Sequence, residues 1–405
     1  MNQGLISVDE ALALMLAGAS PVVEVDEVPT LEAGGRVLAR AQTSRMNVPP
    51  MDNSAMDGYA VRAAEAAKPG ARLRVAQRIA AGSVGAPLAP GTAARIFTGA
   101  PVPEGADAIV MQEHCTLNGE QVVVNQAPAP GEWVRRVGSD IRAGGEILPA
   151  GIRLRPQDTG LAASVGIATL PVHRRVRLAL FFTGDELVMP GEALQPGRIY
   201  NSNRFTLNAL ARLFGCEVRD YGIVPDRLDA TRDMLRRAAT GSDIIVTSGG
   251  VSVGDEDHVR PAVEAEGTLQ MWRIAMKPGR PLAFGRVRGA GGEAAFIGLP
   301  GNPVSSFITF LLFVRPFLLR TQGIAQVAPR AIEARADFDW PRPDRRREYL
   351  RVKWNLNGGL DLYPTQDSAV LTSTVWADGV VDNPAGGEVA KGDRVKFLAF
   401  SELYG

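Results

Sequence analysis

Cysteine and histidine are scarce in this sequence of 405 residues. The two cysteines, Cys115 and Cys216, are isolated and form no C-x-x-C pair, so we interpret them as reduced thiols in a cytoplasmic protein. The three histidines, His114, His173 and His258, are dispersed and lack the spacing of a zinc site. A disulfide framework and a zinc centre are therefore disfavoured.

The sequence also has no excess of one charge and no long apolar run. Its 44 basic and 44 acidic residues give a formal net charge of zero, so no overall field attracts nucleic acid or anionic lipid. The longest apolar stretch near the end, residues 307–314, is too short to span a bilayer. The start lacks a basic region, and Ser7 with Glu10 instead predicts a capping box. We expect neither nucleic acid nor a membrane as a partner.

Two common nucleotide-binding patterns are missing as well. The chain contains neither G-x-G-x-x-G nor a Walker A motif. Binding of a dinucleotide and ordinary NTPase activity are therefore disfavoured.

The pattern of strands and helices changes along the chain and predicts a multidomain α/β plus β protein. Residues 1–45 and 142–174 contain helical segments that would form one small mixed, discontinuous domain. Residues 46–141 consist of short β-prone runs separated by glycine and proline, which indicates a β insertion domain. Residues 175–327 alternate strands with helices, and residues 328–405 return to a β pattern.

The alternating segment predicts a parallel sheet covered by helices on both faces. Its strand patterns include "VRLALFF", "CEVRDYGIV", "DIIVTS" and "AAFIGL". Ser202 or Asn203 is expected to cap one helix, and Asn302 with Pro303 to begin a long one. Ligands of such sheets bind beyond the carboxyl ends of the strands, so we expect the functional site at that edge.

Unusual loops follow three of these strands. They are "TGDEL" at 183–187, "SGGVSVGDED" at 248–257 and "LPGNPVSS" at 299–306. One glycine-rich loop would be weak evidence, because glycine also serves any tight turn. Three such loops on one edge of one sheet predict a shared binding site.

The second loop combines groups that attract an anion with groups that repel one. Glycine amides and the helix dipole favour an anion, whereas Asp255, Glu256 and Asp257 oppose it. The combination is consistent if Mg²⁺ arrives with the anion, because Mg²⁺ bridges carboxylates to phosphate oxygens. The pattern therefore indicates metal-assisted phosphoryl or phosphoanhydride chemistry.

Simpler structural interpretations exist for the same residues. The three acids could complement a helix dipole, and Glu186 could cap its own turn. Asp52 and Asp57 could be Asx-turn residues, and Lys277, one of only five lysines, could be a surface residue. The charged run "RPDRRR", 342–347, is interpreted as a solvated turn.

Taken together, six motifs closely resemble the family of molybdopterin molybdenumtransferases, whose eukaryotic relatives include the E domain of gephyrin. The resemblance covers essentially the whole chain and rests on "DNSAMDGYAVR", "RIFTGAPVPEGADAIVMQE", "TGDEL", "SGGVSVGDEDHV", "MKPGRPLAFG" and "GLPGNPVSSFITF". It implies an enzyme that inserts molybdenum from molybdate into adenylylated molybdopterin, requires Mg²⁺ and releases AMP.

The resemblance also implies an architecture. The family forms an elongated homodimer of four-domain subunits. Residues 1–45 and 142–174 would be a linker or dimerisation domain, 46–141 the β insertion domain, 175–327 a three-layer α/β molybdopterin-binding domain, and 328–405 a β-barrel-like domain. The active cleft would lie between the α/β domain of one subunit and the insertion domain of the other.

The site residues follow from the motifs one by one. The catalytic residues implied are Asp57, Thr98, Arg135, Asp140, Glu186, Asp226, Asp257 and Lys277. The substrate-binding residues implied are Thr183, Gly184, Asp185, Ser248, Gly249, Gly250, Ser252, Gly254, Pro300, Gly301, Asn302, Pro303 and Ser368.

Their chemistry suits two anionic substrates. Lys277 and Arg135 can supply positive charge to molybdate and to the phosphoanhydride. Glu186 and Asp257 are the expected Mg²⁺ ligands. Asp57 and Asp140 would act in positioning or in proton transfer.

Two departures from the family pattern and three alternatives stay open. Arg273 stands where relatives often have lysine, and Asp367 with Ala369 replaces glycines beside Ser368. The alternatives are a molybdopterin adenylyltransferase, which is also a possible upstream partner, a scaffold that has lost the chemistry, and tungstate in place of molybdate. The adenylyltransferase usually consists of the α/β domain alone, and the scaffold would have lost its acids.

Overall fold

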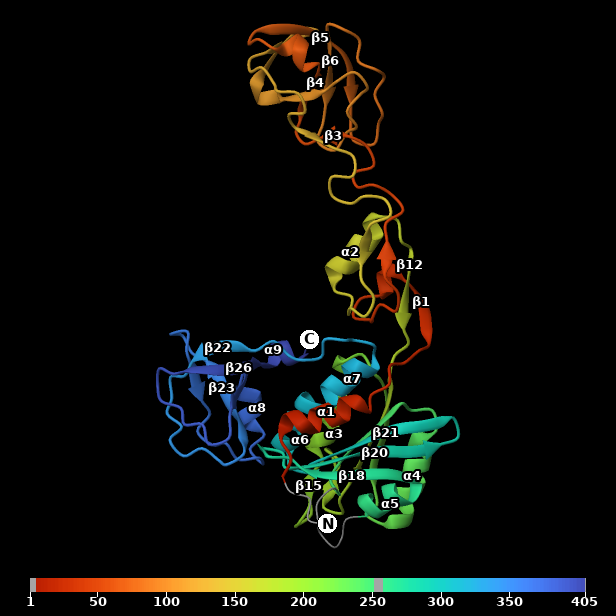
Figure 1. Ribbon diagram of the computed structural model, residues 1–405, viewed down its shortest axis with the longest axis vertical. Coiled ribbons are helices and arrows are strands. Elements are labelled where there is room, and N and C mark those ends of the chain that lie inside the picture. The colour runs from red at the N-terminus through yellow and green to blue at the C-terminus, as the bar shows by residue number, and fades with distance from the viewer. Residues whose placement is uncertain (1–4, 251–257, 405) are drawn as a thin grey trace. The chain divides into compact units, whose positions relative to one another are not determined.

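The computed structural model describes residues 5–250 and 258–404 (Figure 1). The chain divides into two compact units, which we describe separately. The larger unit holds residues 1–27, 35–39 and 171–405, and the smaller unit holds residues 28–34 and 40–170.

The smaller unit contains a β sheet with strand order β7-β4-β6-β5-β9-β8. Side chains alternate between its two faces: Tyr59 and Val61 pack in one core, and Ala60 between them packs in the other. The short strands predicted from the glycine- and proline-rich pattern are thus confirmed. The bounds of the sheet are β4 Gly58–Val61, β5 Ala71–Ile79, β6 Thr92–Ile96, β7 Ala108–Met111, β8 Cys115–Asn118 and β9 Gln121–Val124.

Shorter elements complete this unit. Strand β10 pairs antiparallel with β3, and β11 pairs antiparallel with β2. Helix α2 begins with a proline in its first turn, a position where the missing N–H of proline costs no hydrogen bond. The bounds are β2 Gln42–Thr43, β3 Asn53–Ser54, β10 Val134–Arg135, β11 Glu146–Leu148 and α2 Pro156–Ser164. The chain passes between the units within β1 Val25–Pro29, after residues 34 and 39, and within β12 Thr169–His173.

The larger unit is built on a sheet with strand order β16-β13-β17-β21-β20-β18. Strands β16, β13, β17 and β21 are parallel, as predicted, but β20 runs antiparallel to β21, and the edge strand β18 is antiparallel to β20 and so has the direction of the parallel strands. The sheet is therefore mixed, because β20 and β21 form a hairpin rather than a crossover. The bounds are β13 Arg177–Thr183, β16 Glu217–Val224, β17 Ile244–Ser248, β18 Gly267–Arg273, β20 Pro281–Gly289 and β21 Gly292–Leu299.

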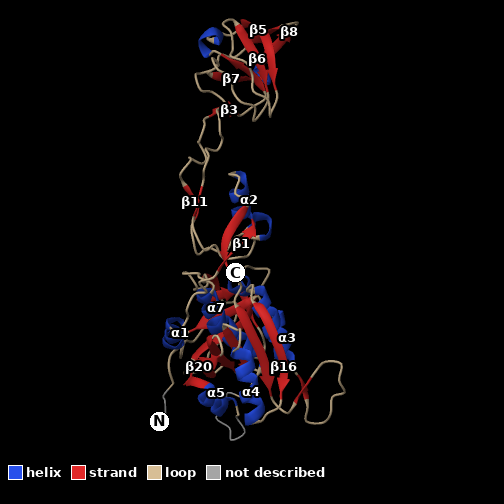
Figure 2. Cartoon of the chain, turned by 90° about the vertical axis from the view of Figure 1, so that its right-hand side faces the viewer, coloured by secondary structure: helices blue, strands red, loops and turns tan. Residues whose placement is uncertain are grey.

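Helices cover both faces of this sheet and give three layers (Figure 2). Leu178 and Leu180 of β13 face a core shared with α1, α3, α6 and α7. Ala179 and Phe181, between them, face a core shared with α4 and α5. Burial on both faces explains why β13 reads as a continuous apolar run. The bounds are α1 Val8–Ala17, α3 Ser202–Leu213, α4 Leu228–Ala239, α5 Val259–Glu266, α6 Pro303–Thr309 and α7 Arg315–Thr321.

The apolar run 303–321 is a core helix. Within it, a π-helical turn at Phe310–Val314 connects α6 to α7. Within the described part of the chain, it is the one helix long and apolar enough to cross a membrane, and 89% of the stretch is buried inside the protein. Its apolar side chains therefore pack in the core of the protein.

Two helix starts differ in detail from prediction. Helix α3 is capped by Asn201, whose side chain accepts a hydrogen bond from the Arg204 amide, and not by Ser202 or Asn203. Asn302 does precede α6, with Pro303 in the first turn, but its side chain makes no capping bond. Ser7 caps α1 as expected, accepting from the Glu10 amide at 3.1 Å.

A second β sheet closes the larger unit, with strand order β19-β23-β25-β26-β22 and β24 paired to β23. The parallel pairing of β19 with β23 joins it to the α/β part of the unit. The predicted multidomain α/β plus β class is confirmed. The bounds are β19 Met276–Lys277, β22 Ile332–Arg335, β23 Arg347–Trp354, β24 Leu360–Leu362, β25 Gly379–Asn383, β26 Arg394–Ala399, α8 Thr372–Trp376 and α9 Phe400–Tyr404.

The amino-terminal ends of β13 and β17 are joined by an ion pair. Arg174 Nη1 and Nη2 each donate to the Asp243 carboxylate at 2.8 Å, and this carboxylate also accepts from the Arg177 amide at 2.7 Å. Burial acts to raise the pKa of Asp243, but the hydrogen bonds from Arg174 and Arg177 outweigh it, so the pKa is lowered.

Asp243→Asn should lower the free energy of unfolding by about 2 kcal/mol at pH 7. A lowered folded-state pKa means that this contribution is complete above the unfolded value of about 3.9 and is lost as the pH falls through the folded-state pKa. The gap in melting temperature between wild type and variant should therefore close below about pH 4. Thermal unfolding from pH 7 to pH 3 measures this gap.

Asp229→Asn is the matched control, because the Asp229 side chain is 76% exposed in its pair with Arg227. It should melt with the wild type at every pH. A gap for Asp243→Asn that widens in acid would contradict the assignment.

Candidate active site

A cleft of about 860 Å³ opens at the carboxyl ends of the parallel strands. Thr183 ends β13, Ser248 ends β17 and is followed by Gly249, and Pro300 with Gly301 follows β21. The three glycine-rich loops of the sequence therefore meet at one place.

Many predicted site residues line this cleft, and others lie elsewhere. The lining includes Thr183, Glu186, Ser248, Gly249, Lys277, Pro300, Gly301, Asn302, Pro303 and Ser368. In the described part of the loops, Gly184, Asp185, Gly250 and Asp226 do not line it. Ser252, Gly254 and Asp257 lie outside the described residues, as do Asp255 and Glu256. Asp57, Thr98, Arg135 and Asp140 belong to the smaller unit.

The Ser248 hydroxyl connects the loops to one another. Its oxygen donates to the Pro300 carbonyl at 2.9 Å and accepts from the Asn203 amide at 2.8 Å. The same amide nitrogen donates to the Gly301 carbonyl at 2.7 Å. Since Ser248 is only 3% exposed, its hydroxyl fixes the geometry of the edge, with its proton already donated inside the protein.

Gly249 and Gly250 are required by the backbone. Their φ angles are 95° and 64°, in the region that favours glycine. A Cβ on Gly249 would lie 2.6 Å from the Thr183 carbonyl oxygen, and one on Gly250 would lie 2.5 Å from the Val259 side chain. The backbone of the loop therefore lies so close to the end of β13 that a side chain would not fit at Gly249 or Gly250.

Two buried polar atoms lie at this edge. The Thr183 hydroxyl and the Asn201 amide nitrogen find no hydrogen-bond partner among the described residues. Both residues line the cleft and are at most 3% exposed. A buried polar atom without a hydrogen bond lowers the stability of the folded protein. These two atoms therefore indicate that this side of the cleft can bind polar groups of a ligand.

The cationic residues Lys277, Arg280 and Arg346 line the cleft. Lys277 ends β19, and Arg346 precedes β23 in the charged run that the sequence pattern assigned to a solvated turn. That interpretation is wrong for Arg346, whose guanidinium bonds Asp344 at 2.8 Å and is 28% exposed. The hydrogen bond from Arg346 outweighs burial and lowers the pKa of Asp344. Sequence reasoning missed Arg346 because the pairing of β19 with β23, which brings this residue to the cleft, joins segments that are distant in the sequence.

The loop 366–369 brings Ser368 to the cleft. The Asn302 amide donates to the Ser368 hydroxyl at 3.0 Å, and the Val304 amide donates to the Ser368 carbonyl at 3.1 Å. This explains why Asn302 does not cap its own helix. Asp367 accepts from the Ala369 amide at 2.7 Å and stabilises the turn locally.

Arg351 supports this loop from behind. It is 1% exposed and donates to the Asp367 carbonyl at 3.1 Å and to the Ser373 hydroxyl at 3.3 Å. Burial lowers the pKa of Arg351 to about 10, and Asp367 offsets this only in part. A buried cation therefore stands behind the Ser368 loop.

Glu186 supplies a carboxylate to the cleft. It is exposed, and no hydrogen bond or ion pair from the described residues engages its side chain. The described residues contain no group of three or more His, Cys, Asp or Glu side chains that could hold a metal ion. A single carboxylate suits Mg²⁺, which commonly uses one or two protein carboxylates with substrate phosphates and water.

In the smaller unit, Asp57 and Thr98 form a bonded pair. The Asp57 carboxylate accepts from both the amide and the hydroxyl of Thr98 at 2.8 Å. These bonds lower the pKa of Asp57, so it is ionised at neutral pH. Arg135 lies on β10 opposite Asn53, and both Arg135 and Asp140 are exposed.

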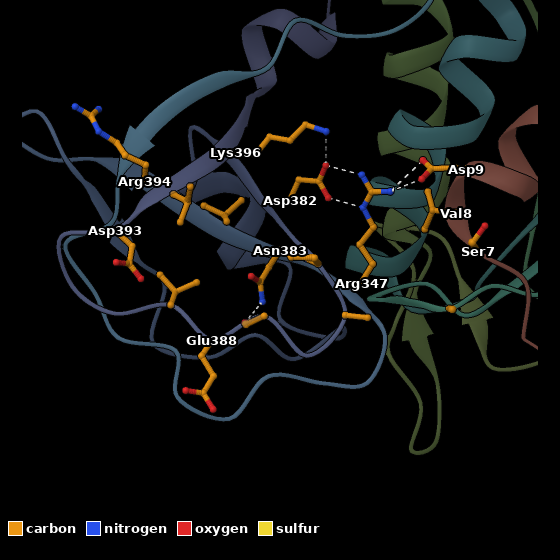
Figure 3. A pocket seen from close by; sticks show the side chains of 17 residues that line it. Ser7, Val8, Asp9, Arg347, Asp382, Asn383, Glu388, Asp393, Arg394 and Lys396 are labelled. Carbon is orange, nitrogen blue, oxygen red and sulfur yellow. Dashed lines mark hydrogen bonds and ion pairs between the residues drawn. The ribbon is translucent and has the colours of Figure 1, made fainter.

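A second cleft of about 730 Å³ lies between the start of α1 and the C-terminal sheet (Figure 3). Arg347 binds Asp382 at 2.7 Å and Asp9 at 3.0 Å, and Lys396 binds Asp382 at 2.8 Å. These side chains form ion pairs with one another, and the pair with Asp9 connects α1 to the C-terminal sheet. The first cleft, with its unpartnered polar atoms, is the better candidate for a site.

Comparison with known proteins agrees with this geometry. Three family models match along the chain: the MoeA N-terminal region (domain I and II) at residues 6–166, a probable molybdopterin binding domain at 179–320, and the MoeA C-terminal region (domain IV) at 333–400.

Curated relatives match over nearly the whole length. The molybdopterin molybdenumtransferase of Haemophilus influenzae is 36% identical and covers 99% of this chain and 100% of its own. That of Nostoc is 37% identical over 81% of this chain and 77% of its own. Gephyrin of Dictyostelium discoideum is 30% identical over 99% of this chain and 63% of its own.

A solved structure of the same kind is similar throughout. The molybdopterin biosynthesis MoeA protein of Pyrococcus horikoshii superposes with a TM-score of 0.85 at 29% identity, over 98% of this chain and 100% of that one. Motifs, fold and relatives agree, and the chain belongs to the family of molybdopterin molybdenumtransferases.

Proposed function

We propose that this protein inserts molybdenum from molybdate into adenylylated molybdopterin, with Mg²⁺-dependent release of AMP. The observation that carries the proposal is the cleft at the strand ends, where Lys277 and Arg346 stand beside the glycine loop at Gly249. Relatives that carry the transferase name over their full length support the same reaction.

The two cations suit molybdate. Molybdate is a compact dianion, and a lysine beside an arginine offers it several N–H donors with full positive charge. Ser368 adds a hydroxyl from the opposite loop, where Asn302 and Val304 hold it in place. We place the oxyanion among these groups.

The glycine loop suits the other substrate. The close approach of Gly249 and Gly250 to β13 leaves room at the strand ends for phosphate or pterin oxygens. The Thr183 hydroxyl and the Asn201 amide lie at the same edge and can complete polar contacts.

Mg²⁺ would be held by Glu186, together with Asp257 beyond the described residues. When bound, it would neutralise the phosphoanhydride oxygens and stabilise AMP as a leaving group. The exposed Glu186 carboxylate is available for this role.

The smaller unit would complete the site from a second subunit. In a cytoplasmic homodimer of four-domain chains, Asp57, Thr98, Arg135 and Asp140 would face the substrates. Since its pKa is lowered, Asp57 would act as a hydrogen-bond acceptor or base and not as an acid. Arg135 would add positive charge.

Purified protein should release AMP from adenylylated molybdopterin only when molybdate and Mg²⁺ are both present. Lys277→Gln should slow this release about 100-fold at fixed molybdate, because one charged donor at a developing or bound anion contributes on that scale. Single-turnover assays of AMP and of molybdenum-loaded pterin measure both effects.

Lys391→Gln is the control, since Lys391 is exposed and distant in sequence from the cleft loops. Consumption of ATP with the unadenylylated pterin would instead indicate an adenylyltransferase. Pterin binding without AMP release under molybdate or tungstate would indicate a carrier or scaffold.

Glu186→Gln should raise the Mg²⁺ concentration needed for half-maximal AMP release by about tenfold, since a neutral amide is a weaker ligand than a carboxylate. A titration of Mg²⁺ at saturating molybdate measures the change. Glu192→Gln, an exposed acid in the following loop, should leave the midpoint unchanged. Equal midpoints for Glu186→Gln and wild type would remove Glu186 from the metal site.

A further inference from the structure

At the junction of β19 and β23, cations face the cleft and carboxylates stand behind them. Lys277 and Arg346 line the cleft, whereas their partners Asp344 and Glu348 do not. The arrangement follows from register, because Lys277 pairs with Glu348 across parallel strands. Each ion pair therefore presents its positive end to the cleft.

Glu348 is firmly fixed. It is 1% exposed, and its Oε2 accepts from the Trp340 indole nitrogen at 2.7 Å and from the Asp344 amide at 3.1 Å. Its Oε1 remains for the Lys277 ammonium, at 3.3 Å. A buried carboxylate held at one oxygen thus directs the other toward the lysine.

Asp344 joins the two cations. Its carboxylate accepts from Arg346 Nε at 2.9 Å and from Arg346 Nη2 at 2.8 Å, and it lies 3.7 Å from Lys277 Nζ. Lysine and arginine are therefore held near each other although like charges repel.

We propose that Glu348 is a positioning residue, which, with Asp344, orients Lys277 and Arg346 as a preformed subsite for the tetrahedral oxyanion. This inference rests on the proposed function. Ordering a long lysine side chain costs conformational entropy when an anion binds. Glu348 orders that side chain in advance, so the anion meets a site that is already arranged.

If Glu348 only neutralised the charge of Lys277, its removal would change the affinity for molybdate in the opposite direction. As a negative charge close to Lys277, it would by charge alone oppose an incoming anion. If neutralisation were its whole effect, removing the charge would tighten molybdate binding. Positioning predicts that removal weakens binding.

Glu348→Gln separates these roles, because its amide oxygen can keep the bonds from Trp340 and Asp344 while its NH₂ group faces Lys277. We expect the Kd for molybdate to rise about tenfold, measured by equilibrium dialysis on the full chain. The kcat for AMP release at saturating molybdate should stay within about twofold of wild type.

Further variants test whether Glu348 affects molybdate binding through Lys277. Adding Glu348→Gln to Lys277→Gln should cause no further loss of binding, because the two residues act through one contact. Trp340→Phe, which removes a bond that fixes Glu348, should raise the Kd in the same direction and serves if Glu348→Gln fails to fold.

Asp382→Asn is the matched control. Asp382 is also a buried, ion-paired carboxylate of the C-terminal sheet, but it faces the other cleft (Figure 3). It should lower the melting temperature and leave the Kd for molybdate unchanged.

Molybdate binding by Glu348→Gln that equals or exceeds wild type would overturn the inference, and so would additivity with Lys277→Gln. Failure of the wild type itself to bind molybdate would overturn the proposed function, and this inference with it. The two failures are thus distinguishable by the wild-type measurement alone.

Discussion

The candidate site depends on the parallel alignment of β13, β17 and β21. Hydrogen bonding between these strands pairs Phe182 with Ser248 and Ser248 with Leu299. The three strands therefore end side by side at the same edge of the sheet. Ser248 then connects the departing loops through Pro300 and Asn203. A change of register in any one strand would separate the loops, and the cleft would lose its wall.

Electrostatics distinguishes the cleft at the strand ends from the cleft beside α1. In the cleft beside α1, Arg347, Lys396, Asp9 and Asp382 satisfy one another across the cavity. In the cleft at the strand ends, the carboxylates that partner Lys277 and Arg346 lie behind those cations. Because adjacent residues of a strand point to opposite sides, Arg347 lines the cleft beside α1, whereas Glu348 pairs with Lys277 at the cleft of the strand ends. One strand, β23, thus stabilises the fold and shapes the site.

Local patterns predicted the elements well and the partners of individual side chains poorly. The pattern "LDATRDMLRRAA" predicts a helix, and α4 occupies the same residues, Leu228–Ala239, because its apolar spacing and polar residues suffice to define it. The cap of α3 was placed one or two residues too late, since Asn201, Ser202 and Asn203 are all good caps locally. Only packing decides that Asn203 turns inward to Ser248 and leaves the capping bond to Asn201.

The sequence by itself determined the family, the α/β plus β class and the loops that carry the cleft, because glycine, proline and acid spacings are read along the chain. It also marked Gly249 and Gly250, where any side chain would meet β13 or α5. The tertiary structure alone decided that Arg346 faces the cleft and that Arg351 lies beneath the Ser368 loop. Those outcomes depend on pairing between distant segments, and a charged or apolar run has the same local pattern whether its partner is water, a strand or a carboxylate.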